Sequence, residues 1–234
     1  MFDGLKDKLA RYLGGQHRRQ SRAMLSNYVP YPQRSERHQV EFRKNEQAIR
    51  QGQIPNRLDE FAKLIPGESF VEVGSADGTL SLHLGRNGKK VFGVELTEYR
   101  HQKALELKEA WLNRGEDVSQ VNFICGDSRQ AGPYLDQVET LVLSRTLYHL
   151  RADAEPLIAR AKQSDALKNI AILGNRVKER VYLEGGNIRG LEKKYLALAS
   201  LQGMSDLLTQ NGFVIELGIE STDETDAVVI ASKD

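Results

Sequence analysis

The stretch that decides the fold is residues 70–81, Phe-Val-Glu-Val-Gly-Ser-Ala-Asp-Gly-Thr-Leu-Ser. An apolar run that contains Glu72 leads to Gly74 and Gly78, and helix-favouring residues follow. Glycine adopts the left-handed backbone angles that tight turns need. The pattern therefore predicts a buried strand, a glycine-hinged turn and the start of a helix, an arrangement suited to a nucleotide-like ligand.

A second acidic residue, Glu95, ends the next apolar segment. In sheets of parallel strands, a carboxylate that binds ribose hydroxyls lies roughly 20 residues beyond the glycine-rich turn. Glu95 stands at about that spacing from Gly74. A glutamate in this place is also compatible with a simple solvent-facing strand end, but the upstream turn and the spacing favour ribose binding.

Outward from this turn, strand and helix signals alternate from about residue 57 onward. Strands are expected at 69–73, 90–95, 121–125, 139–144 and 169–174. Helices are expected at 58–64, 78–86, 98–113, 129–136, 153–163 and 191–210. This alternation predicts an α/β fold with a doubly wound, mostly parallel sheet and helices on both of its faces.

The last part of the chain departs from that alternation. Two strand signals, 213–219 and 227–231, are joined by a short acidic turn with no room for a helix. Strands joined in this way pair antiparallel. The prediction is a seven-stranded sheet with an antiparallel C-terminal edge hairpin, which differs from the pattern of nicotinamide-dependent dehydrogenases.

The composition is that of an ordinary soluble protein. The chain has 234 residues, of which 40% are hydrophobic and 28% charged, and its apolar runs are too short for a membrane span. No secretory signal is predicted, so a cytoplasmic location is expected. Cys125, the one cysteine, cannot form an internal disulfide, and in its apolar strand we expect it to be a core residue.

Charge is distributed unevenly along the chain. Residues 1–57 hold 12 basic and 5 acidic side chains, and the rest of the chain holds 21 and 27, so a +7 segment precedes a domain of charge −6. The basic segment suits an anionic partner or a solvated helical cap. Residues 2–13 have the spacing of an amphipathic basic helix, which fits a membrane interface or, more commonly, packing on the domain.

Together these features resemble the class I S-adenosylmethionine-dependent methyltransferases, whose seventh strand runs antiparallel between the fifth and the sixth. The resemblance covers about residues 57–234, which leaves 1–56 as a basic helical extension or cap. It implies an enzyme with S-adenosyl-L-methionine as its cofactor. The other class of cofactor protein considered, a nicotinamide-dependent oxidoreductase, would need a GxGxxG turn that this chain lacks.

The family's acidic-x-Gly-x-x-x-Gly pattern is matched by Glu72, Gly74 and Gly78. The resemblance implies that the strand acid reaches toward the methionine amino group and that the glycines let the backbone approach the cofactor. Many members carry a third glycine where this chain has Ala76. Alanine is compatible with that place if its backbone angle is not left-handed.

Further cofactor contacts follow from the resemblance. Glu95 corresponds to the carboxylate that accepts from the ribose hydroxyls, and Leu96 to a residue packed on the adenine face. Asp127, followed by Ser128, occupies the place where members often accept from the adenine amino group, although Asp127 also suits the cap of a short helix. The expected cofactor set is completed by Ser75 and Ser144.

The residues after the fourth strand are the candidates for catalysis, because ligands bind where the strand order of such a sheet reverses. Methyl transfer needs an aligned acceptor and, for a hydroxyl, removal of its proton. His149 is a candidate base, Tyr148 a candidate stacking residue and Arg145 a candidate anion clamp. A structural hydrogen bond for His149 and simple packing for Tyr148 remain open.

Two specialised classes are not favoured. Metal-dependent catechol-type enzymes place an aspartate at the end of the fourth strand, where this chain has Ser144, so no catalytic metal is predicted. The Asn/Asp-Pro-Pro-aromatic motif of amino-directed DNA methyltransferases is absent from the sequence, and DNA is not an expected substrate.

The expected reaction is O-methylation of a small-molecule or glycan-like acceptor. A segment at 174–190 carries side chains that suit an anionic acceptor or an exposed charged face: Arg176, Lys178, Arg180, Tyr182 and Arg189. Two alternatives stay open: methylation of RNA held by the basic residues 1–57, and a non-catalytic, membrane-associated cofactor-binding module.

Overall fold

The computed structural model describes residues 46–175, 192–220 and 226–233. Three expectations fall wholly or largely outside these residues: the amphipathic helix at 2–13, most of the basic extension, and the charged segment at 176–190. Within the described part, no helix is long and apolar enough to cross a bilayer.

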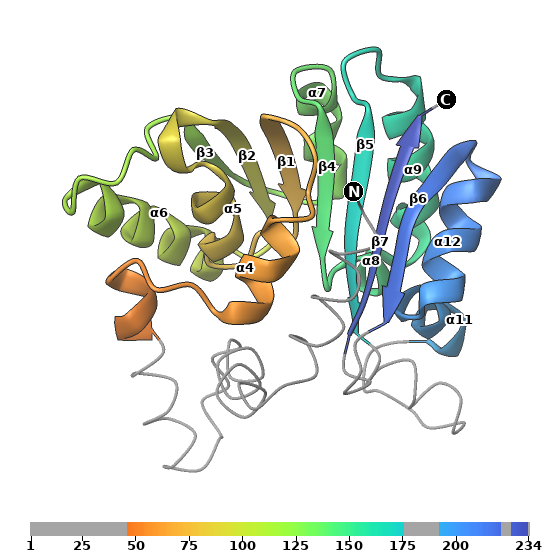
Figure 1. Ribbon diagram of the computed structural model, residues 1–234, viewed down its shortest axis with the longest axis horizontal. Helices are drawn as coiled ribbons and strands as arrows, with labels where there is room; N and C mark the ends of the chain where they lie inside the picture. The colour runs from red at the N-terminus through yellow and green to blue at the C-terminus, as the bar shows by residue number, and fades with distance from the viewer. Residues whose placement is uncertain (1–45, 176–191, 221–225, 234) are drawn as a thin grey trace, which may run out of the picture.

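Seven strands form one sheet in the order β3-β2-β1-β4-β5-β7-β6 (Figure 1). They are β1 Ser69–Val73, β2 Lys90–Glu95, β3 Val121–Cys125, β4 Thr140–Ser144, β5 Asn169–Asn175, β6 Phe213–Glu220 and β7 Asp226–Lys233. β7 pairs antiparallel with both β5 and β6, and the pairs among β1 to β5 are parallel. The predicted mostly parallel sheet with an antiparallel hairpin at its C-terminal edge is confirmed.

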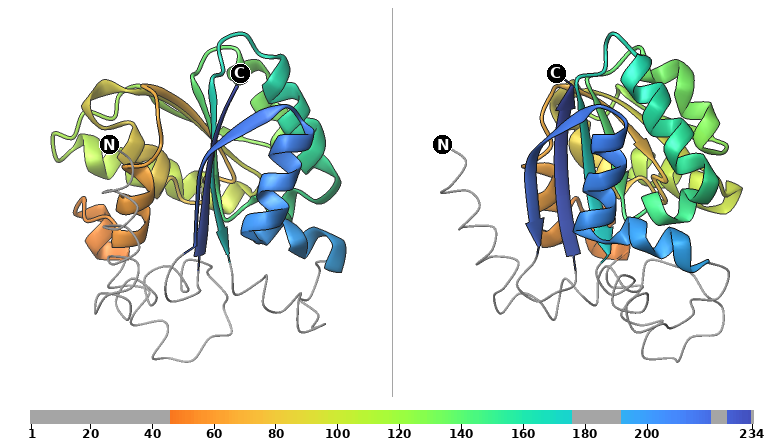
Figure 2. Two further views of the ribbon diagram at one scale, coloured as in Figure 1. Left: turned by 45° about the vertical axis from the view of Figure 1, so that its right-hand side comes forward. Right: turned by 90° about the vertical axis from the view of Figure 1, so that its right-hand side faces the viewer.

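Helices cover both faces of the sheet (Figure 2). One face packs against α4 Asn56–Ala62, α5 Thr79–Leu84 and α6 Glu98–Leu112, and the other against α7 Gly132–Leu135, α9 Ala154–Gln163 and α12 Leu201–Gln210. Short pieces complete the described chain: α8 Leu147–Leu150, α11 Lys193–Leu196, and the 3₁₀ turns η1 Arg86–Gly88, η2 Ser128–Ala131, η3 Arg151–Asp153 and η4 Ala197–Ala199. A doubly wound sheet results, as predicted.

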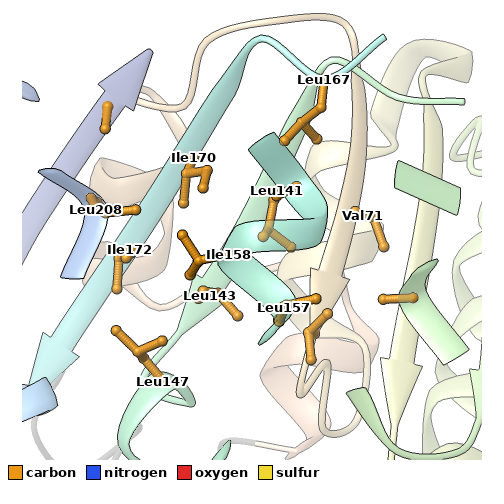
Figure 3. Packing of buried hydrophobic residues seen from close by; sticks show 14 of the residues in the cluster. Val71, Leu141, Leu143, Leu147, Leu157, Ile158, Leu167, Ile170, Ile172 and Leu208 are labelled. Carbon is orange, nitrogen blue, oxygen red and sulfur yellow. The ribbon is translucent and has the colours of Figure 1, made fainter. Parts of the chain in front are cut away.

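The two faces of the central strands are both apolar because both are covered. In Figure 3, Leu141 and Leu143 of β4 lie with Ile170 and Ile172 of β5 beneath Ile158 of α9. The alternate residues of the same two strands, Val142, Ala171 and Leu173, belong to the core on the opposite face. Near-continuous apolar strands are therefore what this architecture requires.

The described end of the N-terminal extension packs on the domain. Residues 46–50 are helical, and Ile49 is buried against the second core. The Trp111 indole N–H donates to the Ile49 carbonyl oxygen at 2.8 Å, and both side chains are fully buried. This part of the extension therefore belongs to the packed body of the protein.

The predicted helix over 191–210 is interrupted at Ser200. Ser200 has extended backbone angles, and its hydroxyl accepts from the Gly203 N–H at 2.9 Å and donates to the Ala197 carbonyl at 2.7 Å. A serine that bonds the local backbone in this way ends one helix and caps the next. The long helix of the prediction is therefore three pieces, α11, η4 and α12.

The expectation that Cys125 is a core residue is wrong. β3 is an edge strand of the sheet, and the Cys125 thiol at its end is exposed. An edge position next to the end of a strand leaves a side chain open to solvent whatever its polarity. The alternation of apolar residues in β3 could not reveal this, because the order of strands is a property of the tertiary fold.

Candidate functional site

The candidate site lies at the carboxyl ends of the parallel strands. β1 and β4 are neighbours in the sheet, and the helices that follow them, α5 and α9, pack on opposite faces. The strand order thus reverses between β1 and β4, and ligands of such sheets bind in the crevice outside this point. The quoted turn 74–78 and the segment 145–149 meet there.

Space and backbone angle both require glycine at two places in the turn. Gly74 and Gly78 each have φ +79°. A Cβ on Gly74 would lie 2.3 Å from Thr146 Oγ1, and one on Gly78 would lie 2.4 Å from the ring of Phe123. The turn therefore lies in direct contact with neighbouring strands, and its position depends on the absence of side chains at these two residues.

Ala76 departs from what the sequence led us to require. Its φ is +52°, so it is left-handed, the one condition under which alanine is unfavourable there. A left-handed non-glycine residue costs about 1–2 kcal/mol. The Ala76 N–H donates to Glu95 Oε2 at 3.0 Å, and this charge-assisted bond helps to hold the strained residue in place.

Glu72 is a buried carboxyl beneath the turn, with 2% of its surface exposed. The Ser81 hydroxyl of α5 donates to Glu72 Oε2 at 2.6 Å. Burial, helped by repulsion from Glu95 and opposed by the Ser81 bond, raises the pKa of Glu72 to about 7. This side chain can therefore gain or lose a proton near neutral pH.

Glu95 is 5% exposed and is fixed by three donors. Its Oε1 accepts from the Thr97 N–H at 2.9 Å and the Thr97 hydroxyl at 2.7 Å, and its Oε2 accepts from Ala76. A carboxylate offers about four acceptor sites. One site on Oε2 is left for a ligand, and a second becomes available only if the Thr97 hydroxyl turns away.

Two residues of the turn have features that the sequence analysis missed: no role was assigned to Asp77, and the surroundings of the Ser75 hydroxyl were not predicted. Asp77 accepts from the Thr79 hydroxyl at 2.9 Å, and burial raises the pKa of Asp77 to about 7. The Ser75 hydroxyl is buried and has no hydrogen-bond partner in the described part of the chain. An acidic residue before the helix was a visible signal for Asp77, whereas the orphaned hydroxyl of Ser75 is visible only in three dimensions.

On the β2 and β3 side, Asp127 adopts its structural alternative. It accepts from the Arg129 N–H at 3.0 Å, caps η2 and pairs with the Arg129 guanidinium, which lowers the pKa of Asp127. Ser128 beside it is buried. Leu96 is 69% exposed, a large apolar side chain open to solvent next to Glu95. The cofactor roles of these three residues remain predictions.

On the β4 side, the structure places two predicted residues in the protein's own contacts. The Arg145 guanidinium pairs with the buried carboxylate of Asp226. Tyr148 is buried against Leu196 and Ala199, and burial raises its pKa. The Tyr148 ring therefore packs in the core, which is the alternative that the sequence left open. Within the described part of the chain, no contact of this ring supports a catalytic role for Tyr148.

His149 and Ser144 lie at the same end of β4. The His149 ring is exposed and lies 4.4 Å from the Tyr148 ring, centroid to centroid, at a tilt of 47°. The Ser144 carbonyl accepts from the Thr146 hydroxyl at 3.0 Å. Among the described residues, no group of three or more His, Cys, Asp or Glu side chains is arranged to hold a metal ion.

Replacing Ala76 with glycine is expected to raise the free energy of unfolding by about 1 kcal/mol, because glycine adopts φ +52° without a Cβ penalty. Urea unfolding measures the change. Ala104→Gly in the interior of α6 is the control, and it should lower stability, since glycine is disfavoured in a helix. A destabilised Ala76→Gly protein would contradict the left-handed assignment.

Glu72→Gln is expected to change the dependence of stability on pH. A carboxyl whose pKa is raised from 4.5 to about 7 binds its proton more tightly in the folded state, so folding stability falls as pH rises through this window. Glutamine does not titrate, so the variant does not lose stability in this way as pH rises. The variant should gain on the order of 1–3 kcal/mol over the wild type between pH 4.5 and pH 8, measured by urea unfolding.

The exposed Glu109→Gln on α6 is the control for this experiment. Its stability relative to the wild type should be nearly the same at both pH values. If Glu72→Gln behaves like Glu109→Gln, the carboxyl of Glu72 is not desolvated in the folded protein.

Residues 71–167 match the family model of the methyltransferase domain. Among solved structures, the magnesium protoporphyrin IX methyltransferase of Synechocystis PCC 6803 with bound S-adenosylmethionine is 15% identical and has a TM-score of 0.54, and the match covers 98% of this chain and 97% of that one. No curated protein matches the chain.

Two more solved structures share the fold. An S-adenosylmethionine-dependent methyltransferase of Aquifex aeolicus is 16% identical with a TM-score of 0.54, covering 80% of this chain and 97% of that one. A protein of the NADB-Rossmann superfamily from Streptococcus agalactiae is 18% identical with a TM-score of 0.55, covering 77% and 69%. The domain match identifies residues 71–167 as a methyltransferase domain, and the solved methyltransferases share the seven-stranded fold of the chain.

Proposed function

We propose that the turn 74–78, with Glu72 and Glu95 beside it, holds S-adenosylmethionine. The observation that carries this proposal is the buried Glu95 carboxylate, which is tied to the left-handed turn and keeps one acceptor site open. The orphaned Ser75 hydroxyl in the same turn fits a ligand that supplies its missing partner. When bound, the cofactor supplies an activated methyl group on a positively charged sulfur.

Charge also favours this ligand. Glu72 and Glu95 lie on the same face of the sheet, and Asp77 follows in the turn, so three carboxyl groups lie in or beside the turn 74–78. Burial raises the pKa of Glu72 and of Asp77, and repulsion from Glu95 adds to the shift at Glu72, so negative charge on these two groups is costly. A ligand with a cationic sulfur and an ammonium group relieves that cost, whereas an anionic phosphate would increase it.

The adenosine end fits the residues after β2 and β3. Exposed Leu96 offers an apolar surface for a planar base, and Asp127 and Ser128 lie at the end of the neighbouring strand. The Asp127 carboxylate accepts from the Arg129 N–H and guanidinium on both of its oxygens, so binding of an amino group there would require the guanidinium to move away. Ser144 contributes from the β4 side, where it is partly exposed.

For the acceptor, we propose a hydroxyl of a small-molecule or glycan-like compound, methylated without a metal. His149 is exposed in the segment after β4, beside the point where the strand order reverses, and an imidazole there suits the removal of a proton from a hydroxyl. The name of the Synechocystis protein, a magnesium protoporphyrin IX methyltransferase, likewise specifies a small-molecule acceptor. Arg145 is not retained as an anion clamp, since its guanidinium holds Asp226.

RNA methylation remains the second candidate, and the positive charge of residues 1–57 favours it. The excess of seven positive charges in residues 1–57 would provide phosphate contacts. Binding to RNA that weakens steeply with added salt would support it, and no binding at low salt would leave the small-molecule acceptor.

Calorimetry with S-adenosylhomocysteine tests the cofactor proposal. The wild type should bind, and Glu95→Ala should weaken binding by about 1–3 kcal/mol, through loss of a charge-assisted bond to the ligand and of the support for the turn. Glu109→Ala on the exposed face of α6 should bind normally. An unchanged dissociation constant for Glu95→Ala would remove the ribose assignment.

Cys125 provides an independent test of the same site. Cys125 pairs in register with Glu95 across β2 and β3, its thiol is exposed, and it is the one cysteine of the chain. Saturating S-adenosylhomocysteine should therefore slow its reaction with a thiol reagent about 5-fold or more, read by absorbance, and the Glu95→Ala protein should lose that protection at the same ligand concentration. Equal rates with and without ligand would place the adenosine away from β3.

With a methyl acceptor in hand, His149→Ala is expected to slow turnover about 100-fold or more, because a general base of this kind contributes on that order. Transfer of a labelled methyl group measures the rate. Affinity for S-adenosylhomocysteine serves as the control and should stay nearly unchanged. A near-normal rate would mean that alignment of the acceptor, with no base, provides most of the catalysis.

A further inference from the structure

Asp226, the first residue of β7, is a buried carboxylate held between two arginines from distant parts of the chain. It is 1% exposed. Its Oδ2 lies 2.5 Å from Arg57 Nε in the first turn of α4, and its Oδ1 accepts from Arg145 Nε at 3.1 Å, with a second bond from Arg145 Nη2. The pairing of Arg145 through two nitrogens fixes the orientation of its planar head as well as its place.

Arg145 has a backbone that is not stable by itself. Its φ is +55°, a left-handed angle for a long side chain directly after β4. Strain of this kind persists where the surroundings over-determine the conformation. Here the Arg145 N–H donates to the Leu173 carbonyl of β5 at 2.7 Å, and the side chain is held by Asp226. Hydrogen bonds therefore hold both the backbone and the side chain of Arg145.

The next residue transmits this position to the cofactor turn. The Thr146 side chain lies where a Cβ on Gly74 would be, with its Oγ1 and Cγ2 at 2.3 and 2.5 Å from that point. Close-packed groups of this kind cannot shift independently. A change in the backbone at Arg145 would move Thr146 either into or away from the Gly74 backbone.

We propose that Asp226 is a positioning residue for the cofactor turn, acting through Arg145 and Thr146 on Gly74. The proposal rests on the proposed function of the turn as the S-adenosylmethionine site. The carboxylate itself does not contact the cofactor in this proposal. It fixes the left-handed residue after β4, and the Thr146 side chain then sets how far the turn extends toward the ligand.

The route predicts a specific response to losing the carboxylate charge. Asp226→Asn keeps the size of the side chain but removes its negative charge, which weakens its bonds to the guanidiniums of Arg57 and Arg145. Arg145 can then relax from its left-handed angle. The dissociation constant for S-adenosylhomocysteine, measured by calorimetry on the full chain, should rise at least 10-fold. Arg145→Lys, which keeps the charge but loses the planar fork, should raise it in the same direction.

A control separates positioning from simple loss of stability. Ser164 is also buried, and its hydroxyl donates to the Leu135 carbonyl at 2.7 Å at the opposite end of the sheet. Ser164→Ala should lower the melting temperature with a dissociation constant within twofold of the wild type. If Asp226→Asn and Arg145→Lys both bind within twofold of the wild type, the proposal is overturned.

A double-mutant cycle tests the route through Thr146. Thr146→Ala removes the two atoms nearest to Gly74, Oγ1 and Cγ2, so in that background Asp226→Asn should change the dissociation constant much less than in the wild type. An equal fold-change in both backgrounds would overturn the route. Failure of the wild type to bind S-adenosylhomocysteine would instead refute the cofactor site itself, so the two failures are distinguishable.

Discussion

The contact between the Gly74 backbone and the Thr146 side chain is the constraint on which the site depends. It joins the ends of β1 and β4, the two neighbouring strands at which the sheet reverses its order. Any side chain at residue 74 would clash there, and the left-handed angle alone would already disfavour it. The cofactor turn and the segment that carries His149 meet at this contact, and the buried pair of Arg145 with Asp226 lies directly beside it.

Buried carboxyl groups have different electrostatic surroundings on the two sides of the contact. On the β1 side, burial raises the pKa of Glu72 and of Asp77 to about 7, and Glu72 is near the Glu95 carboxylate, so acidic groups gather where a cationic ligand is proposed. On the β4 side, the buried Asp226 is compensated by arginine. Buried carboxyl groups that are costly to ionise therefore lie where a ligand is expected. Where the backbone must be rigid, the buried carboxylate is paired with arginine.

Much of the fold could be predicted because it follows from local pattern. Apolar runs bounded by glycine and polar residues located β1 and β2 to the residue, and the missing helix between the last two strands predicted their antiparallel pairing. The break at Ser200 was missed because a serine is compatible with a helix until its hydroxyl finds the backbone of its neighbours. Exposure of Cys125 was missed because it depends on which strand ends the sheet.

The sequence by itself determined the order of the elements, the glycine-hinged turn and the acidic residues at the ends of β1 and β2, since these depend on spacing along the chain. Only the tertiary structure decided that Ala76 is left-handed, that the Ser75 hydroxyl is orphaned and that Arg57, Arg145 and Asp226 meet. The physical reason is sequence separation: Asp226 lies 81 residues from Arg145, and no local pattern encodes a contact that forms only when β7 pairs with β5.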